Sequence, residues 1–192
     1  MKTRKILSEF KEIVGPDHTA LVVWDVQNLL VSRIFNREEF LKNVTDLIAM
    51  ARKADVPIFF TKITPLPERF ESGVRLSQRR FPGGISPEQM ELSIKPEQDD
   101  IILLKNTANI FIGTNFELMI RNAGIQTIIF SGIATEIGIE SSARDSMNRG
   151  FYTVVVEDAV SSADKSAHER SLANMRNMLM VRKTSEIAGA WT

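Results

Sequence analysis

Residues 20–25 read Ala-Leu-Val-Val-Trp-Asp, five apolar residues followed by one carboxylate. A short apolar run of this kind predicts a strand that is buried on both faces, as the strands of parallel sheets are. Helical patterns separate this run from similar ones, which predicts βαβ units around a mostly parallel sheet. The further strands are expected at 57–61, 101–104, 127–130 and 153–156.

The first expected helix follows the first strand. Its apolar residues recur at helical spacing from Phe40 to Ala51, and Asn36 with Glu39 fits an N-cap arrangement. We expect further helices at 115–122, 135–148 and through 172–179. The whole pattern predicts one α/β domain over residues 1–192, a doubly wound sheet of order 3-2-1-4-5-6 with helices on both faces. Residues 1–17 are expected to form an N-terminal helix or arm.

Residues 62–99 interrupt this rhythm with five prolines and three glycines, so they cannot form one regular element. A short helix is expected where Ser86 and Gln89 form a capping box. An insertion of this length is typical of a lid, a binding loop or a subunit contact. Its arginines form either a solvated surface or a clamp for a substrate carboxylate, and our candidates for the clamp are Arg75 and Arg79.

The composition excludes several classes of protein. The 24 basic and 24 acidic residues balance, which does not favour a nucleic-acid partner. The chain has no cysteine, which excludes disulfides, zinc–cysteine sites, iron–sulfur clusters and thiolate nucleophiles. Two histidines without metal-ligand spacing, and no G-x-G-x-x-G after the first strand, predict neither a metal site nor a nucleotide cofactor. No apolar run approaches the ~20 residues of a membrane span, so we expect a cytoplasmic protein without membrane contact.

Candidate functional residues lie where the predicted strands end. In an open parallel sheet, ligands bind outside the carboxyl ends of the strands. Asp25 follows the first strand, Lys105 follows the third, and a turn at 132–138 follows the fourth. Because the fourth strand lies beside the first in the predicted order, we expect these groups to meet at one crevice.

Asp25 and Lys105 can be interpreted in two ways. A carboxylate that leaves water beside an ammonium is a candidate acid–base unit. A structural ion pair, a helix cap or a strand end has the same appearance in a sequence. Gln27 orients Asp25, binds a polar group of a substrate, or only shapes the turn.

The turn after the fourth strand combines small and polar residues. Gly132 allows a tight backbone, and Thr135 is expected to cap the next helix, which leaves free N–H groups near Ile137 and Gly138 as an anion site. The alternative is an ordinary junction that needs small residues for packing. Glu136 is either a base that activates water or an acidic residue that interacts with the helix dipole.

Together these segments resemble the isochorismatase-like hydrolases, also called the cysteine hydrolase family, over nearly the whole chain. Four ordered motifs carry the resemblance, in residues 21–27, 105–117, 131–145 and 149–159. The resemblance implies that Asp25 and Lys105 are catalytic and that Gly138 stands where most members have the nucleophilic cysteine. The substrate-binding candidates that accompany them are Gln27, Arg75, Arg79, Ala134, Thr135, Glu136 and Ile137.

Within the family, glycine at position 138 is typical of the isochorismatases proper and not of the amidases. Nicotinamidases depend on the cysteine and have a metal site after the second strand, where residues 61–65 supply no such ligands. Isochorismatases proper have glycine and cleave a vinyl ether, which needs protonation of the enol-ether carbon and addition of water. Asp25 is the implied acid, Lys105 holds the substrate carboxylate or positions Asp25, and Gly138 is expected to leave room for a ring substrate or for water.

The expected function is therefore a metal-independent hydrolase that acts on a small carboxylate-bearing molecule through acid–base catalysis with water. Isochorismate itself is not the expected substrate, because residues 134–136 lack the tyrosine and histidine of that branch. The alternative is a catalytically lapsed ligand-binding or assembly protein on the same fold. The resemblance also implies a homodimer or homotetramer, in which the 62–99 insertion could reach a neighbouring subunit.

Overall fold

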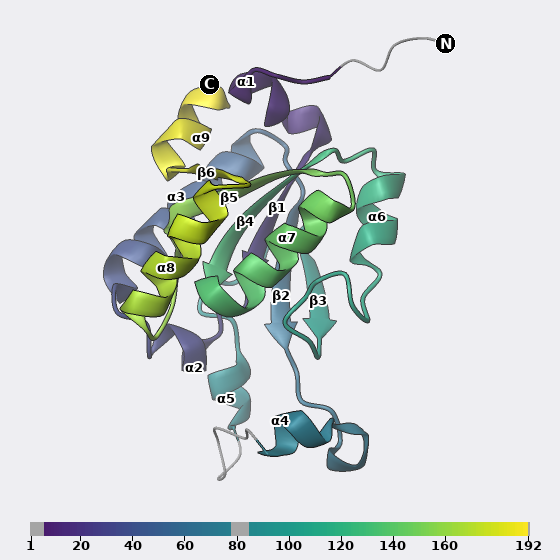
Figure 1. Cartoon of the computed structure of the whole chain (residues 1–192), viewed down its shortest axis with the longest axis vertical. Coiled ribbons are helices and arrows are strands. Elements are labelled where there is room, and N and C mark those ends of the chain that lie inside the picture. Colours follow the sequence, from purple (N-terminus) through teal and green to yellow (C-terminus); the bar gives the residue numbers. More distant parts are fainter. Residues whose placement is uncertain (1–5, 78–84, 192) are drawn as a thin grey trace.

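The computed structural model describes residues 6–77 and 85–191. Within them, the strands form one six-stranded sheet of order β3-β2-β1-β4-β5-β6, in which every neighbouring pair is parallel (Figure 1). This confirms the predicted fold class and strand order. β6 is the strand without a predicted position, because three half-buried residues are too few to show a strand pattern. The strands are β1 (Thr19–Trp24), β2 (Ile58–Ile63), β3 (Ile101–Lys105), β4 (Thr127–Ile133), β5 (Tyr152–Ser161) and β6 (Met180–Arg182).

Helices connect the strands, and the predicted helices are present with shifted ends. The helix expected from residue 135 begins as a π-helical turn, Thr135–Ile139, before it continues as an α-helix. Asn36 is an N-cap residue by position, but its side chain accepts a hydrogen bond from Ser161 and does not cap the helix. The helices are α1 (Phe10–Ile13), α2 (Asn28–Val31), α3 (Arg37–Lys53), α4 (Gly73–Ser77), α5 (Pro87–Met90), α6 (Phe116–Asn122), α7 (Glu140–Asn148), α8 (Lys165–Arg176) and α9 (Thr184–Ala190).

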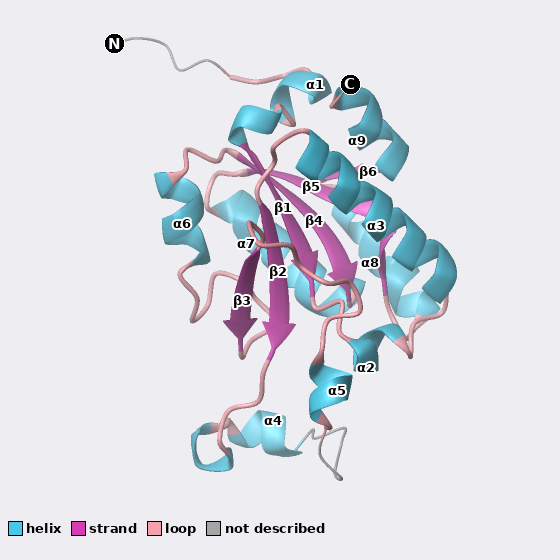
Figure 2. Ribbon diagram, turned by 180° about the vertical axis from the view of Figure 1, so that it is seen from behind, coloured by secondary structure: helices cyan, strands magenta, loops and turns pink. Residues whose placement is uncertain are grey.

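Two apolar cores lie on opposite faces of the sheet, as a doubly wound fold requires. Successive residues of β2 show the division, because Phe60 belongs to the core under α3 and α9 while Phe59 belongs to the core under α6, α7 and α8. Figure 2 shows α3 and α9 on one face and α7 behind the sheet. The side chains of β1 and β4 are buried throughout, which explains their continuous apolar runs.

The predicted insertion forms an arm that projects from the carboxyl ends of the strands (Figure 1). We use the name arm for residues 64–77 and 85–91, which include a short 3-10 helix, Glu68–Phe70, together with α4 and α5. The first two residues of the predicted insertion belong to β2 instead. The capping box of α5 is confirmed, since the Gln89 N–H donates to Ser86 Oγ at 3.2 Å and the Ser86 N–H donates to Gln89 Oε1 at 2.9 Å.

The predicted N-terminal segment contains α1 and a 3-10 turn, Pro16–His18, within its described residues. Among the helices of residues 6–77 and 85–191, none is both long and apolar enough to cross a bilayer.

Candidate active site

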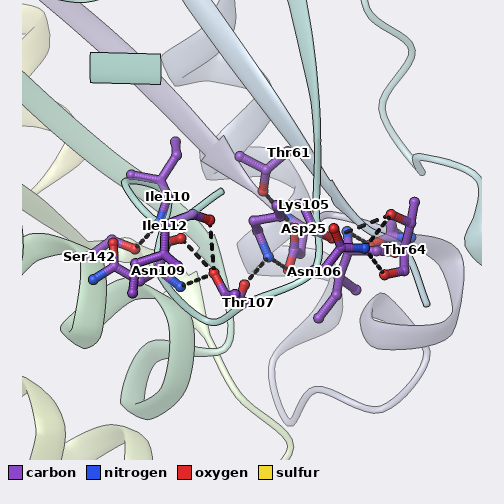
Figure 3. Close-up of polar contacts among 12 residues, drawn as sticks. Asp25, Thr61, Thr64, Lys105, Asn106, Thr107, Asn109, Ile110, Ile112 and Ser142 are labelled. Atoms are coloured by element: carbon purple, nitrogen blue, oxygen red, sulfur yellow. Dashed lines mark hydrogen bonds and ion pairs between the residues drawn. The ribbon is translucent and has the colours of Figure 1, made fainter. Parts of the chain in front are cut away.

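Asp25 and Lys105 meet at the carboxyl ends of β1 and β3, on either side of β2 (Figure 3). Lys105 Nζ lies 2.6 Å from Asp25 Oδ2, and both residues are buried, with 1% and 3% of their surfaces exposed. Thr61 of the intervening strand donates from Oγ1 to Asp25 Oδ1 at 2.5 Å and accepts from the Asp25 N–H at 3.0 Å. The predicted meeting of the carboxylate and the ammonium is confirmed, and Thr61 is a partner that sequence reasoning did not identify.

Burial dominates the acid–base properties of this pair. Loss of water raises the pKa of Asp25 above its usual value, and the hydrogen bonds from Lys105 and Thr61 oppose this shift. Burial likewise lowers the pKa of Lys105, while Asp25 opposes the shift and the charge of Arg75 adds to it. Burial thus favours the neutral form of each group, while the contact between the two groups favours their charged forms.

Lys105 has no free direction left for a substrate. Besides Asp25, its Nζ reaches the carbonyl oxygen of Thr107 at 3.3 Å (Figure 3) and lies 3.9 Å from the centre of the Trp24 ring. An ammonium has three N–H donors, so the carboxylate, the carbonyl and the indole face use all of them. Both oxygens of Asp25 are also hydrogen-bonded within the chain.

The indole of Trp24 fills the space beside Gly138. A β-carbon built on Gly138 would lie 2.2 Å from Trp24 Nε1 and 2.3 Å from Cε2, and Trp24 is only 2% exposed. The expectation that Gly138 leaves room for a ring substrate or for water is therefore wrong, because a side chain from β1 occupies that room. In the sequence, Trp24 shows only the pattern of an apolar strand residue.

The turn after β4 has no free backbone N–H group at the positions predicted to bind an anion, Ile137 and Gly138. The N–H groups of Ile137, Gly138 and Ile139 all point to the carbonyl oxygen of Ala134, at 3.2, 3.1 and 3.2 Å. The prediction of free N–H groups for an anion is therefore wrong, since the π-helical turn directs them to one backbone acceptor. Gly132 does allow a tight backbone, because its φ is +118° and a β-carbon there would lie 2.1 Å from the Trp24 carbonyl oxygen.

Thr135 and Glu136 face away from the Asp25–Lys105 pair and toward β5 and α8. Thr135 Oγ1 contacts the Ser161 carbonyl oxygen at 3.1 Å and His168 Nδ1 at 2.8 Å, and it does not cap a helix. Glu136 Oε1 accepts from Ser162 Oγ at 2.7 Å, while its buried Oε2 has no partner among the described residues. His168 was missed in the sequence, because a single helical histidine gives no signal of its contacts.

Gln27 and Arg75 organise the arm. Gln27 Oε1 accepts from the Ile63 N–H at 3.0 Å and Nε2 donates to the Met90 carbonyl at 2.9 Å, so one buried amide joins the two ends of the arm. Gln27 therefore shapes the backbone: its N–H donates to the Asp25 carbonyl oxygen at 2.7 Å, while the hydrogen bonds of its side-chain amide go to Ile63 and Met90 and not to the Asp25 carboxylate. Arg75 donates to the carbonyl oxygen of Asn106 and leaves 38% of its side chain exposed. Arg79 lies outside the described residues.

Over the described ranges, no three side chains of histidine, cysteine, aspartate or glutamate are grouped as metal ligands would be.

The chain is similar to known proteins in both sequence and fold. A family profile described as "Isochorismatase domain" matches residues 19–186. The Escherichia coli O157:H7 protein "Uncharacterized isochorismatase family protein YecD" is 31% identical over 179 residues, which cover 90% of this chain and 95% of that protein. "Ureidoacrylate amidohydrolase RutB" of Pseudomonas savastanoi pv. phaseolicola (strain 1448A / Race 6) is 27% identical, with 83% of this chain and 78% of that protein covered.

A solved cysteine hydrolase from Pseudomonas syringae pv. phaseolicola 1448A has the same fold, with a TM-score of 0.85, 19% identity and 98% of each chain covered. The nicotinamidase PncA from Bacillus subtilis superposes with a TM-score of 0.71 at 21% identity, over 86% of this chain and 99% of that one.

Proposed function

The chain belongs to the isochorismatase family of hydrolases, and from this premise we propose that it is a member whose hydrolytic site is closed and that it works as a ligand-binding protein. The relatives named above include an amidohydrolase and a cysteine hydrolase. This chain has no cysteine, so it cannot use a thiolate nucleophile, which the name of the cysteine hydrolase implies for that protein.

The position of the Trp24 indole is the observation that carries this proposal. The ring stands where a nucleophilic side chain on residue 138 would have to be, and its face covers the ammonium of Lys105. Water attack would need a free volume beside Gly138, and the indole occupies that volume. The Asp25–Lys105 pair then acts as a buried structural ion pair, which is one of the two interpretations that the sequence left open.

The proposed ligand is a small molecule with a carboxylate. Arg75 supports this class, because it lies on the arm beside the loop that follows Lys105. Its Nη1 lies 3.6 Å from Glu71 Oε1, and more than a third of its side chain remains open to solvent. A guanidinium has five N–H donors and pairs with a carboxylate through two of them.

The second candidate function is hydrolysis of a vinyl ether with Asp25 as the acid. The raised pKa of Asp25 favours it, since a protonated carboxyl group near neutral pH is what such an acid needs. This route requires the indole of Trp24 to leave its position, so that substrate and water reach Asp25.

One experiment separates the two functions. Vinyl ethers, amides and ureido acids, ureidoacrylate among them, are incubated with the native chain and with Asp25→Asn, and products are measured by mass spectrometry. We expect no turnover above the Asp25→Asn background. Turnover that disappears in Asp25→Asn would overturn the closed-site proposal and favour the vinyl-ether route or an amide route through Asp25.

Ligand binding is tested separately by thermal unfolding with a series of small carboxylates. A ligand that binds only the folded chain raises its melting temperature. We expect a rise with the native chain and no rise with Arg75→Gln. Arg170→Gln, a change on α8, is the matched control and should behave as the native chain does. No response to any carboxylate would contradict the proposed ligand class.

A further inference from the structure

The outer edge of β3 is open. β3 is the last strand on its side of the sheet, and within residues 6–77 and 85–191 no strand lies beyond it (Figure 1). Natural edge strands are usually protected from pairing by charges, prolines or bulges. Residues 101–104 read Ile-Ile-Leu-Leu and contain none of these, and the charged residue at the end of the strand, Lys105, is buried.

One face of β3 is also uncovered. Ile102 and Leu104 are 49% and 61% exposed, although both are aliphatic. Ile102 is the register partner of Phe60, so these side chains lie on the face that α3 and α9 cover elsewhere. α3 packs mainly against β5, and Figure 2 shows it well away from β3. The exposed aliphatic pair therefore continues a core face beyond the reach of its helices.

The direction of the backbone groups restricts how a new strand can pair here. The Thr64 N–H donates to the Lys105 carbonyl at 2.8 Å, so the backbone of Lys105 faces β2. Because backbone groups alternate in direction along a strand, the N–H and C=O groups of Ile102 and Leu104 face outward.

We propose that β3 pairs antiparallel with β3 of a second copy of this chain, so that the two sheets join into one. An isologous pair centred on Leu103 places Ile102 opposite the partner's Leu104, and the reverse. These are the residues whose backbone groups face outward, so both hydrogen bonds of each pair can form. Their side chains also lie on one face, where the exposed aliphatic groups of the two copies cover one another.

Charge supports a second copy as the occupant. Asp99, two residues before β3, is exposed, and Arg75, which also lies 3.6 Å from Glu71, contacts Asn106, directly after β3. In an antiparallel pair the start of one strand lies beside the end of the other. Asp99 of each copy thus lies toward the partner's Arg75, and the strand segment between them, residues 101–104, carries no charge that would repel a second copy.

Single introduced cysteines test the register, because the chain has none of its own. Ile102→Cys and Leu104→Cys are mixed under reducing conditions and then oxidised. We expect an interchain disulfide in the mixture only, since opposite residues have Cα atoms about 5.5 Å apart, within the reach of a disulfide. In either variant alone, the two cysteines are diagonal neighbours and stay too far apart. No crosslink, or equal crosslinking in all three samples, would overturn the proposed register.

The oligomeric mass tests the surface itself. Light scattering of the full chain should give a dimer or a multiple of it, and Leu104→Lys should raise the dimer dissociation constant by about 100-fold or more, since each dimer loses two buried leucines. Met147→Lys is the matched control, because Met147 is 39% exposed on α7, across the sheet, and this variant should keep the native mass. A monomeric native chain, or a dimer that Leu104→Lys leaves intact, would overturn the proposal.

Discussion

The indole of Trp24 packs against the backbone of Gly138 so closely that no β-carbon fits between them. The two residues come from β1 and from the turn after β4, and they are 114 positions apart in the sequence. The residue type at each of these two positions restricts the residue type at the other. A tryptophan on β1 can be buried here because residue 138 has no side chain, and residue 138 cannot gain one while the tryptophan is present.

Gly138→Ala should therefore lower the free energy of unfolding by about 2 kcal/mol, the usual cost of overpacking a core. Trp24→Val alone should lower it by about 3 kcal/mol through the cavity it creates. In the double variant the two effects should be less than additive by roughly 1 kcal/mol, because the methyl group enters the vacated space. Urea unfolding measures all three.

The matched control for this cycle is Gly189→Ala on α9, where a β-carbon would meet nothing within 4 Å. It should leave stability nearly unchanged or raise it slightly, since alanine favours helix. Strict additivity of the Trp24 and Gly138 changes would contradict the contact.

Asp25→Asn should destabilise the fold by about 3 kcal/mol, because it leaves the ammonium of Lys105 buried without a counter-charge. Asp25→Asn combined with Lys105→Met should cost less than Asp25→Asn alone, since the double change removes both charges. The exposed pair Lys42 and Asp46 is the control, and its loss should have almost no effect. A double variant less stable than either single variant would exclude a mainly structural ion pair.

His168 should make stability depend on pH. Burial lowers its pKa below the ordinary 6.5, although the charge of Glu136 opposes the shift. Over the range between the two values the unfolded chain binds more protons, so the free energy of unfolding falls as the pH drops from about 6.5 through the folded pKa. Urea unfolding at a series of pH values should show a smaller fall for His168→Gln, and equal slopes would contradict the lowered pKa.

Gln27→Leu should loosen the arm. The change removes the side-chain partners of the Ile63 N–H and the Met90 carbonyl, each worth about 1–3 kcal/mol when left unsatisfied. Trypsin should then cleave after Arg69 and Arg75 several-fold faster than in the native chain. Gln126→Leu, a change of an exposed glutamine directly before β4, is the control and should leave the cleavage rate unchanged. Equal rates for Gln27→Leu and the native chain would show that the amide does not hold the arm.

Much of the fold could be predicted from local pattern. The apolar runs of β1 and β4 mark strands covered on both faces, and the order of a doubly wound sheet then brings Asp25 and Lys105 to one edge. β6 escaped prediction because it is short and only half-buried. The π-helical turn escaped because Thr135 has the residue type of a cap, while its hydroxyl finds partners in β5 and α8 that are distant in sequence.

The amino-acid sequence by itself determined the α/β architecture, the family resemblance and the absence of a thiol, because periodicity, motif spacing and residue type are properties of the chain alone. Only the tertiary structure decided whether the volume beside Gly138, where relatives have a cysteine side chain, is empty or filled. That depends on which distant side chain fills the volume beside Gly138, and packing between elements far apart in sequence brings the Trp24 indole there.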